Sequence, residues 1–375
     1  MKRKLFIRVL LCMLLCFAAL CGQAEELSNA DYKYTIMDGQ VTITRYLGAG
    51  GTVTIPGYID GLPVTTIGEA AFQHLSSKKI THVTIPDTVT VIEDRAFCEM
   101  WTLESVTFPR NLKTIGVSAF YNNLLTNVSL PESVTSLGSM AFYANKKLEE
   151  LHLPDGITEM GTEVANASTK IYCGTYSDTA KNMTDHPFAD PDAPHLFLQY
   201  RADGGLAVVD YTGAQSSVRI PEGVTEIARE AFQGAIYTNS ITIPESVTTI
   251  GAAAFESCRN LKSITLPNSI TSIGGSAFLG CTALRDVKLP AGNVTYGSNI
   301  FGDCTGLRSV VFPEGNTMIG DTMFRYCTAL SSVTIPDSLT SIGHNAFHGC
   351  KSLTGITLLD NITSLGAMCS SMRTT

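Results

Sequence analysis

The sequence predicts a solenoid that is mainly β, in which successive turns of equal length stack on one another. Six prolines recur every 23 residues from Pro221 to Pro336, and Leu359 takes the next position. A phenylalanine follows each of these prolines by eleven residues, and from Cys258 to Cys350 a cysteine lies three residues further on. Unlike residues that keep one common spacing indicate a repeated structural unit, which is stable only when several units stack.

The repeat unit can be written V-T-I-P-x-S-V-T-x-I-G-x-x-A-F-x-x-C-x-x-L-x-S. This unit resembles the BspA-like leucine-rich repeats of bacterial proteins, and the resemblance covers nearly the whole chain after residue 50. The resemblance implies a right-handed leucine-rich-repeat solenoid with a parallel β-sheet. It also implies a secreted or cell-surface protein that attaches to host proteins, to other cells or to matrix.

Residues 1–24 have the features of a secretory signal peptide. Basic residues at the start precede an apolar run at 9–20, which is too short to span a bilayer, and small residues follow. Cys21 allows an alternative, the lipid-modified cysteine of a lipoprotein, but Leu20 before it is bulkier than the small residue usual there. We therefore expect plain export to the cell surface or the medium, without a membrane span.

The chain is acidic. It carries 26 basic and 34 acidic residues, a net charge of −8, and removing residues 1–24 takes away four basic residues and no acidic residue. The mature chain then has 22 basic against 34 acidic residues, a net charge of −12. Nucleic acid and anionic lipid are not expected partners of such a chain, because both repel negative charge.

Two segments that precede repeats predict hairpins. Asp38-Gly39 and Asp203-Gly204 are each flanked by alternating apolar residues, the strongest short signal for a β-hairpin. A hairpin over the first turn protects the open end of a solenoid. We therefore expect two arrays, residues 25–184 and 196–375, each with an N-terminal hairpin cap and joined by a linker rich in proline and aspartate at 185–195.

The first array is less regular than the second. Its prolines Pro56 and Pro86 are 30 residues apart because of an insertion at 57–63, and residues 169–182 predict a last short strand followed by a polar helical turn. The second array reaches Thr375 without a closing strand. Either the reading frame is truncated there or another segment covers the edge, and we favour truncation.

The turn around Pro267 shows how each unit is expected to fold. Residues 263–266 alternate as a strand that proline ends, residues 269–273 predict a second, narrower parallel strand, and residues 275–280 predict one helical turn. The side chains expected to point inward are Ile264, Leu266, Ile270, Ile273, Ala277, Phe278, Cys281 and Leu284.

Eleven cysteines in an exported chain would ordinarily suggest disulfides. Five of them instead occupy the same place in successive turns, where side chains point in parallel rather than at one another. We expect these five to be free, buried thiols, since free cysteine is among the most buried residue types. Cys98 lies outside this column, so an exposed position is open to it.

The sequence offers no reaction centre. His344 and His348 form H-N-A-F-H, which lacks the acidic residue and the third ligand of a metalloprotease. Asp190 and Asp192 flank a proline, and a rigid acidic linker explains them better than a calcium site. We expect no enzyme activity, no cofactor and no metal.

Partner binding is expected on the concave sheet. The outward positions two residues before each proline are Thr54, Thr84, Thr107, Ser129, His152, Arg219, Thr242, Thr265, Lys288, Val311, Thr334 and Thr357. Serine and threonine dominate this face, as β-propensity alone would select on an exposed strand. The exceptions are therefore the candidate partner-binding residues: Asp286, Lys288, Val311, Arg219 and His152.

Two functions remain open at this point. One is a non-catalytic adhesion protein that binds protein through the solenoid surface. The alternative is a structural spacer or envelope scaffold whose active partner domain is missing from the chain, which an extended polar face with few aromatic residues also fits.

Overall fold

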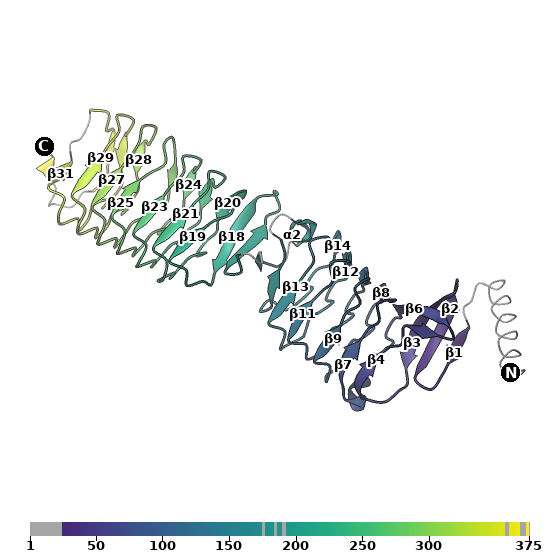
Figure 1. Ribbon diagram of the computed structural model, residues 1–375. Helices are drawn as coiled ribbons and strands as arrows, with labels where there is room; N and C mark the ends of the chain where they lie inside the picture. Colours follow the sequence, from purple (N-terminus) through teal and green to yellow (C-terminus); the bar gives the residue numbers. More distant parts are fainter. Residues whose placement is uncertain are drawn as a thin grey trace, which may run out of the picture. The chain divides into compact units, whose positions relative to one another are not determined.

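The computed structural model describes residues 25–174, 177–183, 186–189, 193–356, 360–367 and 373–374. The chain divides into two compact units, residues 1–191 and 192–375, each of which is described by itself (Figure 1). The expected signal peptide with Cys21, together with Thr357 and Leu359, lies outside the described residues.

A β-hairpin opens the first unit, as the sequence predicts. Strands β2 (Tyr32–Met37) and β3 (Gln40–Tyr46) pair antiparallel around Asp38 and Gly39, whose φ angles are 50° and 72°. Two left-handed residues in a two-residue turn match the twist of the flanking strands. Strand β1 (Glu26–Ser28) pairs antiparallel with β2, and β3 pairs parallel with the first turn of the solenoid.

Two rows of short parallel strands follow in the first unit. The main strands that precede the repeat prolines are β4 (Gly51–Thr54), β7 (Ile80–Thr84), β9 (Ser105–Thr107), β11 (Asn127–Ser129) and β13 (Glu150–His152). The same row continues in β15 (Lys170–Tyr172) and β16 (Phe188–Ala189), which lie beyond the last repeat proline. The narrow strands are β6 (Leu62–Ile67), β8 (Val91–Ile92), β10 (Thr114–Ile115), β12 (Ser136–Leu137) and β14 (Glu159–Met160).

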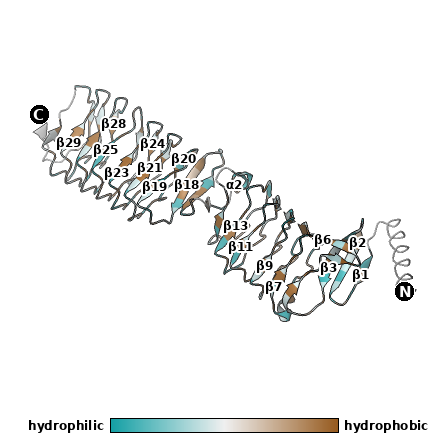
Figure 2. Cartoon of the chain, in the orientation of Figure 1, coloured by the Kyte–Doolittle hydropathy of each residue, from teal (hydrophilic) through white to brown (hydrophobic). Residues whose placement is uncertain are grey.

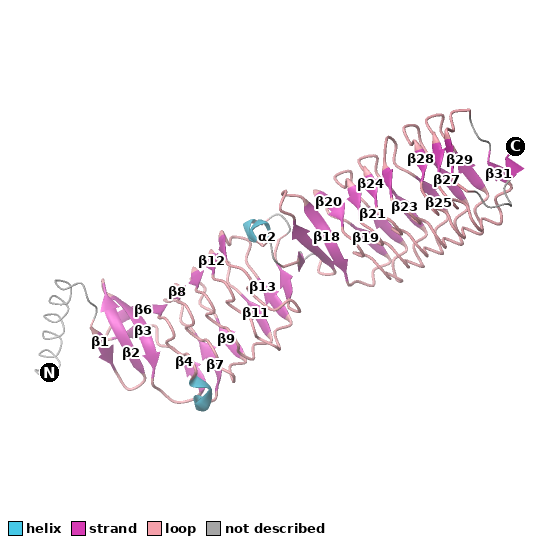
Figure 3. Ribbon diagram, turned by 180° about the vertical axis from the view of Figure 1, so that it is seen from behind, coloured by secondary structure: helices cyan, strands magenta, loops and turns pink. Residues whose placement is uncertain are grey.

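The insertion and the last turn complete this unit. Strand β5 (Tyr58–Ile59) pairs antiparallel with β6, so the insertion at 57–63 is a small hairpin. The 3-10 helix η1 (Leu75–Lys78) and the helix α2 (Asp178–Asn182) are the helical elements of the described residues (Figure 3). The strand β15 and the helix α2 match the short strand and the helical turn predicted at 169–182. Strand β16 pairs with β15, although it lies in the range expected to be a linker.

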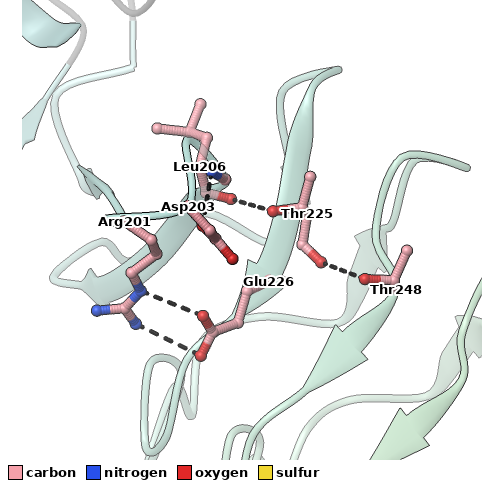
Figure 4. A network of polar contacts seen from close by, with 7 residues as sticks. Arg201, Asp203, Leu206, Thr225, Glu226 and Thr248 are labelled. Atoms are coloured by element: carbon pink, nitrogen blue, oxygen red, sulfur yellow. Dashed lines mark hydrogen bonds and ion pairs between the residues drawn. The ribbon is translucent and has the colours of Figure 1, made fainter.

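The second unit opens with the other predicted hairpin, strands β17 (Leu196–Tyr200) and β18 (Leu206–Tyr211), which are antiparallel. Polar contacts fasten it to the first turns (Figure 4). The Arg201 guanidinium donates to both carboxylate oxygens of Glu226, at 3.2 and 3.4 Å. Thr225 Oγ1 donates to the Leu206 carbonyl, and Thr248 Oγ1 donates to the Thr225 carbonyl, both at 3.3 Å.

From β19 to β31 the main strands of the second unit keep the 23-residue register, whereas β33 pairs with β31 at an offset of 18 residues. The main strands are β19 (Ser217–Arg219), β21 (Ser240–Thr242), β23 (Ser263–Thr265), β25 (Asp286–Lys288), β27 (Ser309–Val311), β29 (Ser332–Thr334) and β31 (Gly355–Ile356), with β33 (Arg373–Thr374) paired to β31. The narrow strands are β20 (Val224–Ile227), β22 (Thr249–Ile250), β24 (Ser272–Ile273), β26 (Thr295–Tyr296), β28 (Met318–Ile319), β30 (Ser341–Ile342) and β32 (Ser364–Leu365).

The strand predictions are confirmed. A main strand ends two residues before each repeat proline from Pro56 to Pro336, and the paired strands of successive turns run parallel. The narrow strand of the turn at Pro267 is shorter than expected, Ser272–Ile273. All eight side chains predicted to point inward in that turn are buried. In Figure 2 the strands carry both hydrophobic and hydrophilic colours, as residues that alternate between core and surface must.

The predicted helical turn after each narrow strand is wrong in its conformation. In the turn at Pro267 this segment is a series of tight turns, with left-handed φ angles of 57° at Ser276 and 71° at Gly280. A left-handed residue interrupts a helix, and it turns the backbone N–H groups toward the neighbouring turn. Phe278 N donates to the Ile300 carbonyl at 2.9 Å, and Gly280 N donates to the Gly302 carbonyl at 2.8 Å. The corner thus adds a third ladder between turns.

A stack of aromatic rings forms the centre of each unit. In the second unit the Phe278 ring lies between those of Phe255 and Phe301, with ring centroids 5.1 and 5.2 Å away and interplanar angles of 11° and 7°. Tyr46 and Tyr211, at the ends of the two hairpins, head the stacks of their units. Equal spacing of rings follows from equal length of turns, because a ring at one position of the repeat meets its own copy.

The five repeat cysteines are free and buried, as predicted. The structure adds the reason for their position, which is a hydrogen bond. Each thiol donates to the carbonyl of the phenylalanine in the preceding turn, for example Cys281 Sγ to Phe255 O at 3.2 Å. In the first unit Asn123 and Asn145 stand at this position, and their amides donate to the equivalent carbonyls at 3.0 and 2.8 Å. Cysteine and asparagine therefore have the same role at this position, which is to donate a hydrogen bond to that carbonyl. An apolar side chain also fits there, since Met100 lies three residues after Phe97 and is fully buried.

Cys98, for which the sequence left an exposed position open, is buried in the structure. This thiol is only 5% exposed, although it lies one residue after its phenylalanine rather than three. Burial, with the negative charge of Glu99 next in importance, raises the pKa of Cys98.

Truncating an interior ring should destabilise the second unit strongly. We expect Phe278→Ala to lower the free energy of unfolding by about 3–5 kcal/mol, because the side chain is fully buried and leaves a cavity between two rings. Leu279→Ala is the matched control, since this neighbour is partly exposed and its loss should cost much less. Denaturant titration measures both. Equal effects of the two changes would contradict the stacked core.

The thiol column should resist modification until the protein unfolds. A hydrogen bond with Cys281 and burial raise the pKa of Cys258, and burial raises the pKa of Cys327, so both stay neutral in the folded chain. Thiol labelling of native protein should leave the five cysteines unmodified, and denaturant should expose all five.

The same shifts predict a pH dependence. In the unfolded chain a thiol ionises near pH ~8.5, whereas the folded thiol stays protonated well above that value. The contribution of the column to stability is complete below pH ~8.5 and decreases as the pH rises further. Denaturant titrations at neutral and alkaline pH measure this loss. A midpoint that rises with alkaline pH would contradict the assignment.

Candidate functional site

The main strands carry the candidate binding face, because their backbone fixes which side chains reach solvent. Most strands of three residues bury their middle side chain and leave the two outer ones partly or fully exposed. In β23, for example, Ile264 is buried while Ser263 and Thr265 are exposed. In β9 and β29 the middle side chain is half-buried, and in β15 the outer residue Tyr172 is buried. We call the outer positions of the main strands the main face of each unit. Since the core uses only the middle residue, these positions are free to vary without loss of the fold.

Three of the predicted candidates meet on the main face of the second unit. Strands β25 and β27 are parallel neighbours, with Asp286 opposite Ser309 and Lys288 opposite Val311 (Figure 1). Val311 is 37% exposed, which is unusual for an aliphatic side chain on this face. Asp286 accepts a hydrogen bond from Ser309 Oγ at 2.5 Å, so its charge is engaged across the two strands.

Arg219 lies three main strands away from this group, at the first turn of the same unit. Its guanidinium is 3.8 Å from the Glu222 carboxylate, and both side chains are largely exposed. It also lines a cavity of about 180 Å³ together with His195, Tyr211 and Gln215. Tyr211 donates to Gln215 Oε1 at 2.7 Å. The structure therefore separates Arg219 from the other candidates of its unit.

His152 belongs to the first unit and stands in a small polar cluster on its main face. The imidazole stacks on the Tyr172 ring of the next strand, with centroids 4.7 Å apart, and Nε2 is 3.5 Å from the Glu150 carboxylate. Burial, followed by the charge and hydrogen bond of Glu150, raises the pKa of the Tyr172 hydroxyl. These contacts hold His152 against its own sheet.

The sequence analysis missed a row of basic residues beside this face. Lys262, Arg285 and Arg308 immediately precede β23, β25 and β27, and all three are exposed. Arg308 N donates to the Arg285 carbonyl at 2.7 Å, which places these two residues on neighbouring turns. The 23-residue spacing of the three was available in the sequence. These residues lie five residues before each proline, just outside the two outer positions of the main strands.

The described residues contain no group of three or more histidine, cysteine, aspartate or glutamate side chains that could hold a metal ion. Nor does any helix in this part of the chain have the length and apolar character needed to cross a membrane. His344 Nδ1 accepts a hydrogen bond from Ala367 N at 3.0 Å in the next turn, so this ring has a structural role.

Comparison with known proteins agrees with this architecture. The family described as BspA type leucine-rich repeat region, in six copies, matches residues 65–192, 210–331 and 317–372. The chain belongs to this family. Its BspA-type repeats thus include the turns that carry the main face of both units. No curated protein is similar enough to match the chain.

Several solved structures from bacteria are similar to this chain. A leucine-rich repeat protein from Bacteroides ovatus is 24% identical over 93% of this chain and 90% of its own, with a TM-score of 0.48. A leucine-rich cell surface protein from Faecalibacterium prausnitzii is 27% identical over 83% of this chain and 95% of its own, with a TM-score of 0.37. The pneumococcal vaccine antigen PcpA is 18% identical over 92% and 98%, with a TM-score of 0.41.

Proposed function

We propose that this BspA-type protein is exported, is displayed at the cell surface or released, and binds other proteins through its main face without catalysing a reaction. The observation that carries the proposal is that different residues of each turn form the core and the main face. Successive turns bury recurring columns of side chains, while most outer positions of the main strands stay partly or fully exposed. Repeats of this kind provide large exposed surfaces on which recognition residues can vary.

The departures from serine and threonine support a particular part of that face. Asp286, Lys288 and Val311 are side by side on β25 and β27, and together they offer charge beside an exposed aliphatic group. Protein interfaces combine such charged rims with apolar contacts. We therefore place the centre of partner binding on these two strands.

A triple replacement tests this placement. We expect Asp286→Ser, Lys288→Thr and Val311→Thr together to leave folding intact, since these residues occur at the equivalent positions of β23 and β29. Surface changes of this kind shift stability by about 0.5 kcal/mol or less. Binding to purified host matrix proteins, measured by surface plasmon resonance, should be lost or strongly weakened in the variant.

The matched control replaces the half-buried Thr84 and the exposed Thr107 of the first unit, Thr84→Ser and Thr107→Ser, and should bind as the parent does. If a matrix protein binds parent and triple variant with equal affinity, the binding surface lies elsewhere, for which the exposed Tyr58 of the insertion is the next candidate. A chain that binds none of the proteins specifically would instead support the role of a spacer.

Export predicts a defined N-terminus for the mature protein. If residues 1–24 are a cleaved signal peptide, mass spectrometry of protein recovered from the producing cells should find Glu25 as the first residue. A lipoprotein would instead begin at Cys21 and carry the added mass of its lipid. Recovery of the chain from the cytoplasm with residues 1–24 still attached would contradict export.

A further inference from the structure

A concentration of unpaired positive charge marks the middle of the second unit. Between residues 259 and 311 the chain has five basic and two acidic residues, whereas the whole chain has a net charge of −8. The five are Arg259, Lys262, Arg285, Lys288 and Arg308. In the described part of the chain no ion pair joins any of them to an acidic side chain. The nearest acidic group in the sequence, Asp286, is hydrogen-bonded to Ser309 instead.

Three of these residues, Lys262, Arg285 and Arg308, form what we call the basic row. They occupy one position of the repeat in three successive turns. Strands β25 and β27, which follow Arg285 and Arg308, pair in parallel, and paired strands lie about 4.8 Å apart. Strand β23, which follows Lys262, lies next to β25 but belongs to a separate sheet. Like charges held so close repel each other, and this weakens the folded state rather than supporting it. The basic row therefore has a cost that the fold itself does not explain.

The same position in other turns shows that a basic residue is not needed there. Asn239 and Ser331 stand at this position in the turns on either side of the basic row, and their backbones make the same hydrogen bonds between turns. In the first unit the position holds Glu104 and Glu149. Because neutral and acidic residues fit this place equally, the positive charge of the row serves something other than folding.

We propose that the basic row, with Lys288 and Val311 beside it on the main face, is a docking surface for an acidic polypeptide segment. The inference rests on the proposed function and names the chemistry of its partner. Arginine binds a carboxylate through two parallel hydrogen bonds, and charged hydrogen bonds of this kind are among the stronger ones. The hydroxyl groups of Ser263 and Thr265 on β23 provide donors for peptide carbonyls.

The character of the neighbouring residues favours a peptide over other polyanions. Val311 offers an exposed aliphatic contact, which an apolar side chain of a peptide can use. None of the six outer residues of β23, β25 and β27 is aromatic, so this face offers no ring on which a sugar or a base could stack. The net negative charge of the whole chain also repels long polyanions such as nucleic acid.

Peptide binding by the full chain tests the proposal. The probe is a fluorescent peptide of about ten residues, rich in glutamate with one valine, which is long enough to span the row at about 3.4 Å per residue. The matched probe replaces every glutamate with glutamine. Fluorescence anisotropy should detect binding of the glutamate peptide only, and this binding should weaken as the salt concentration rises from about 50 to about 300 mM.

Variants of the chain then locate the binding. We expect Lys262→Ser, Arg285→Ser and Arg308→Ser together to lower the affinity for the glutamate peptide by about ten-fold. The effect is limited because each exposed charge pair contributes modestly to binding. Folding should persist, since Ser331 already occupies this position. Arg325→Ser is the control, because Arg325 is exposed in the next turn, where its guanidinium lies over the Tyr326 ring. It should leave the affinity unchanged.

Three results would overturn the proposal: no binding of the glutamate peptide, equal affinity of parent and triple variant, or tighter binding of a uronic-acid polysaccharide or of DNA at matched charge. The last result would assign the basic row to a different class of polyanion. These failures differ from a failure of the proposed function. A chain that ignores the glutamate peptide but still captures a matrix protein through Asp286, Lys288 and Val311 contradicts only the inference about the basic row.

Discussion

The structure depends on one constraint, the constant length of the turn. When each turn repeats the last, every side chain meets its own copy one turn away, and the rings of Phe255, Phe278 and Phe301 stack at nearly equal distances. The backbone follows the same rule, because the N–H of each of these phenylalanines donates to the turn that follows. A single turn buries too little to be stable alone, so packing and hydrogen bonding between turns supply the stability together.

The constant length of the turn also determines which polar groups meet inside the core. The carbonyl of each phenylalanine is buried, and a buried carbonyl without a donor is costly. Cys281 in the second unit and Asn123 in the first meet this requirement with different chemistry, one through a thiol and the other through an amide. Two residues that look unrelated in the sequence are therefore equivalent in the structure, because each places a small donor beneath the ring of the preceding turn.

This arrangement separates the residues that stabilise the fold from the residues that can bind a partner. The middle residue of a main strand contributes to the core, and the residues on either side of it contribute little, so charge and shape can change on the face while the columns stay constant. The basic row illustrates this freedom, since Lys262, Arg285 and Arg308 stand where Glu104 and Glu149 stand in the first unit. The same backbone thus presents opposite charge in its two units, and recognition depends on which side chains occupy otherwise interchangeable positions.

The sequence by itself determined the period, the strands before each proline, the two hairpins at Asp38 and Asp203, and the buried columns of phenylalanine and cysteine. These are periodic or local features, and spacing alone fixes which copies meet. Only the tertiary structure decided the conformation of the corners, the burial of Cys98, and the shared role of cysteine and asparagine. Those features depend on which atoms of a neighbouring turn accept a hydrogen bond or cover a side chain, and residue spacing does not contain that information.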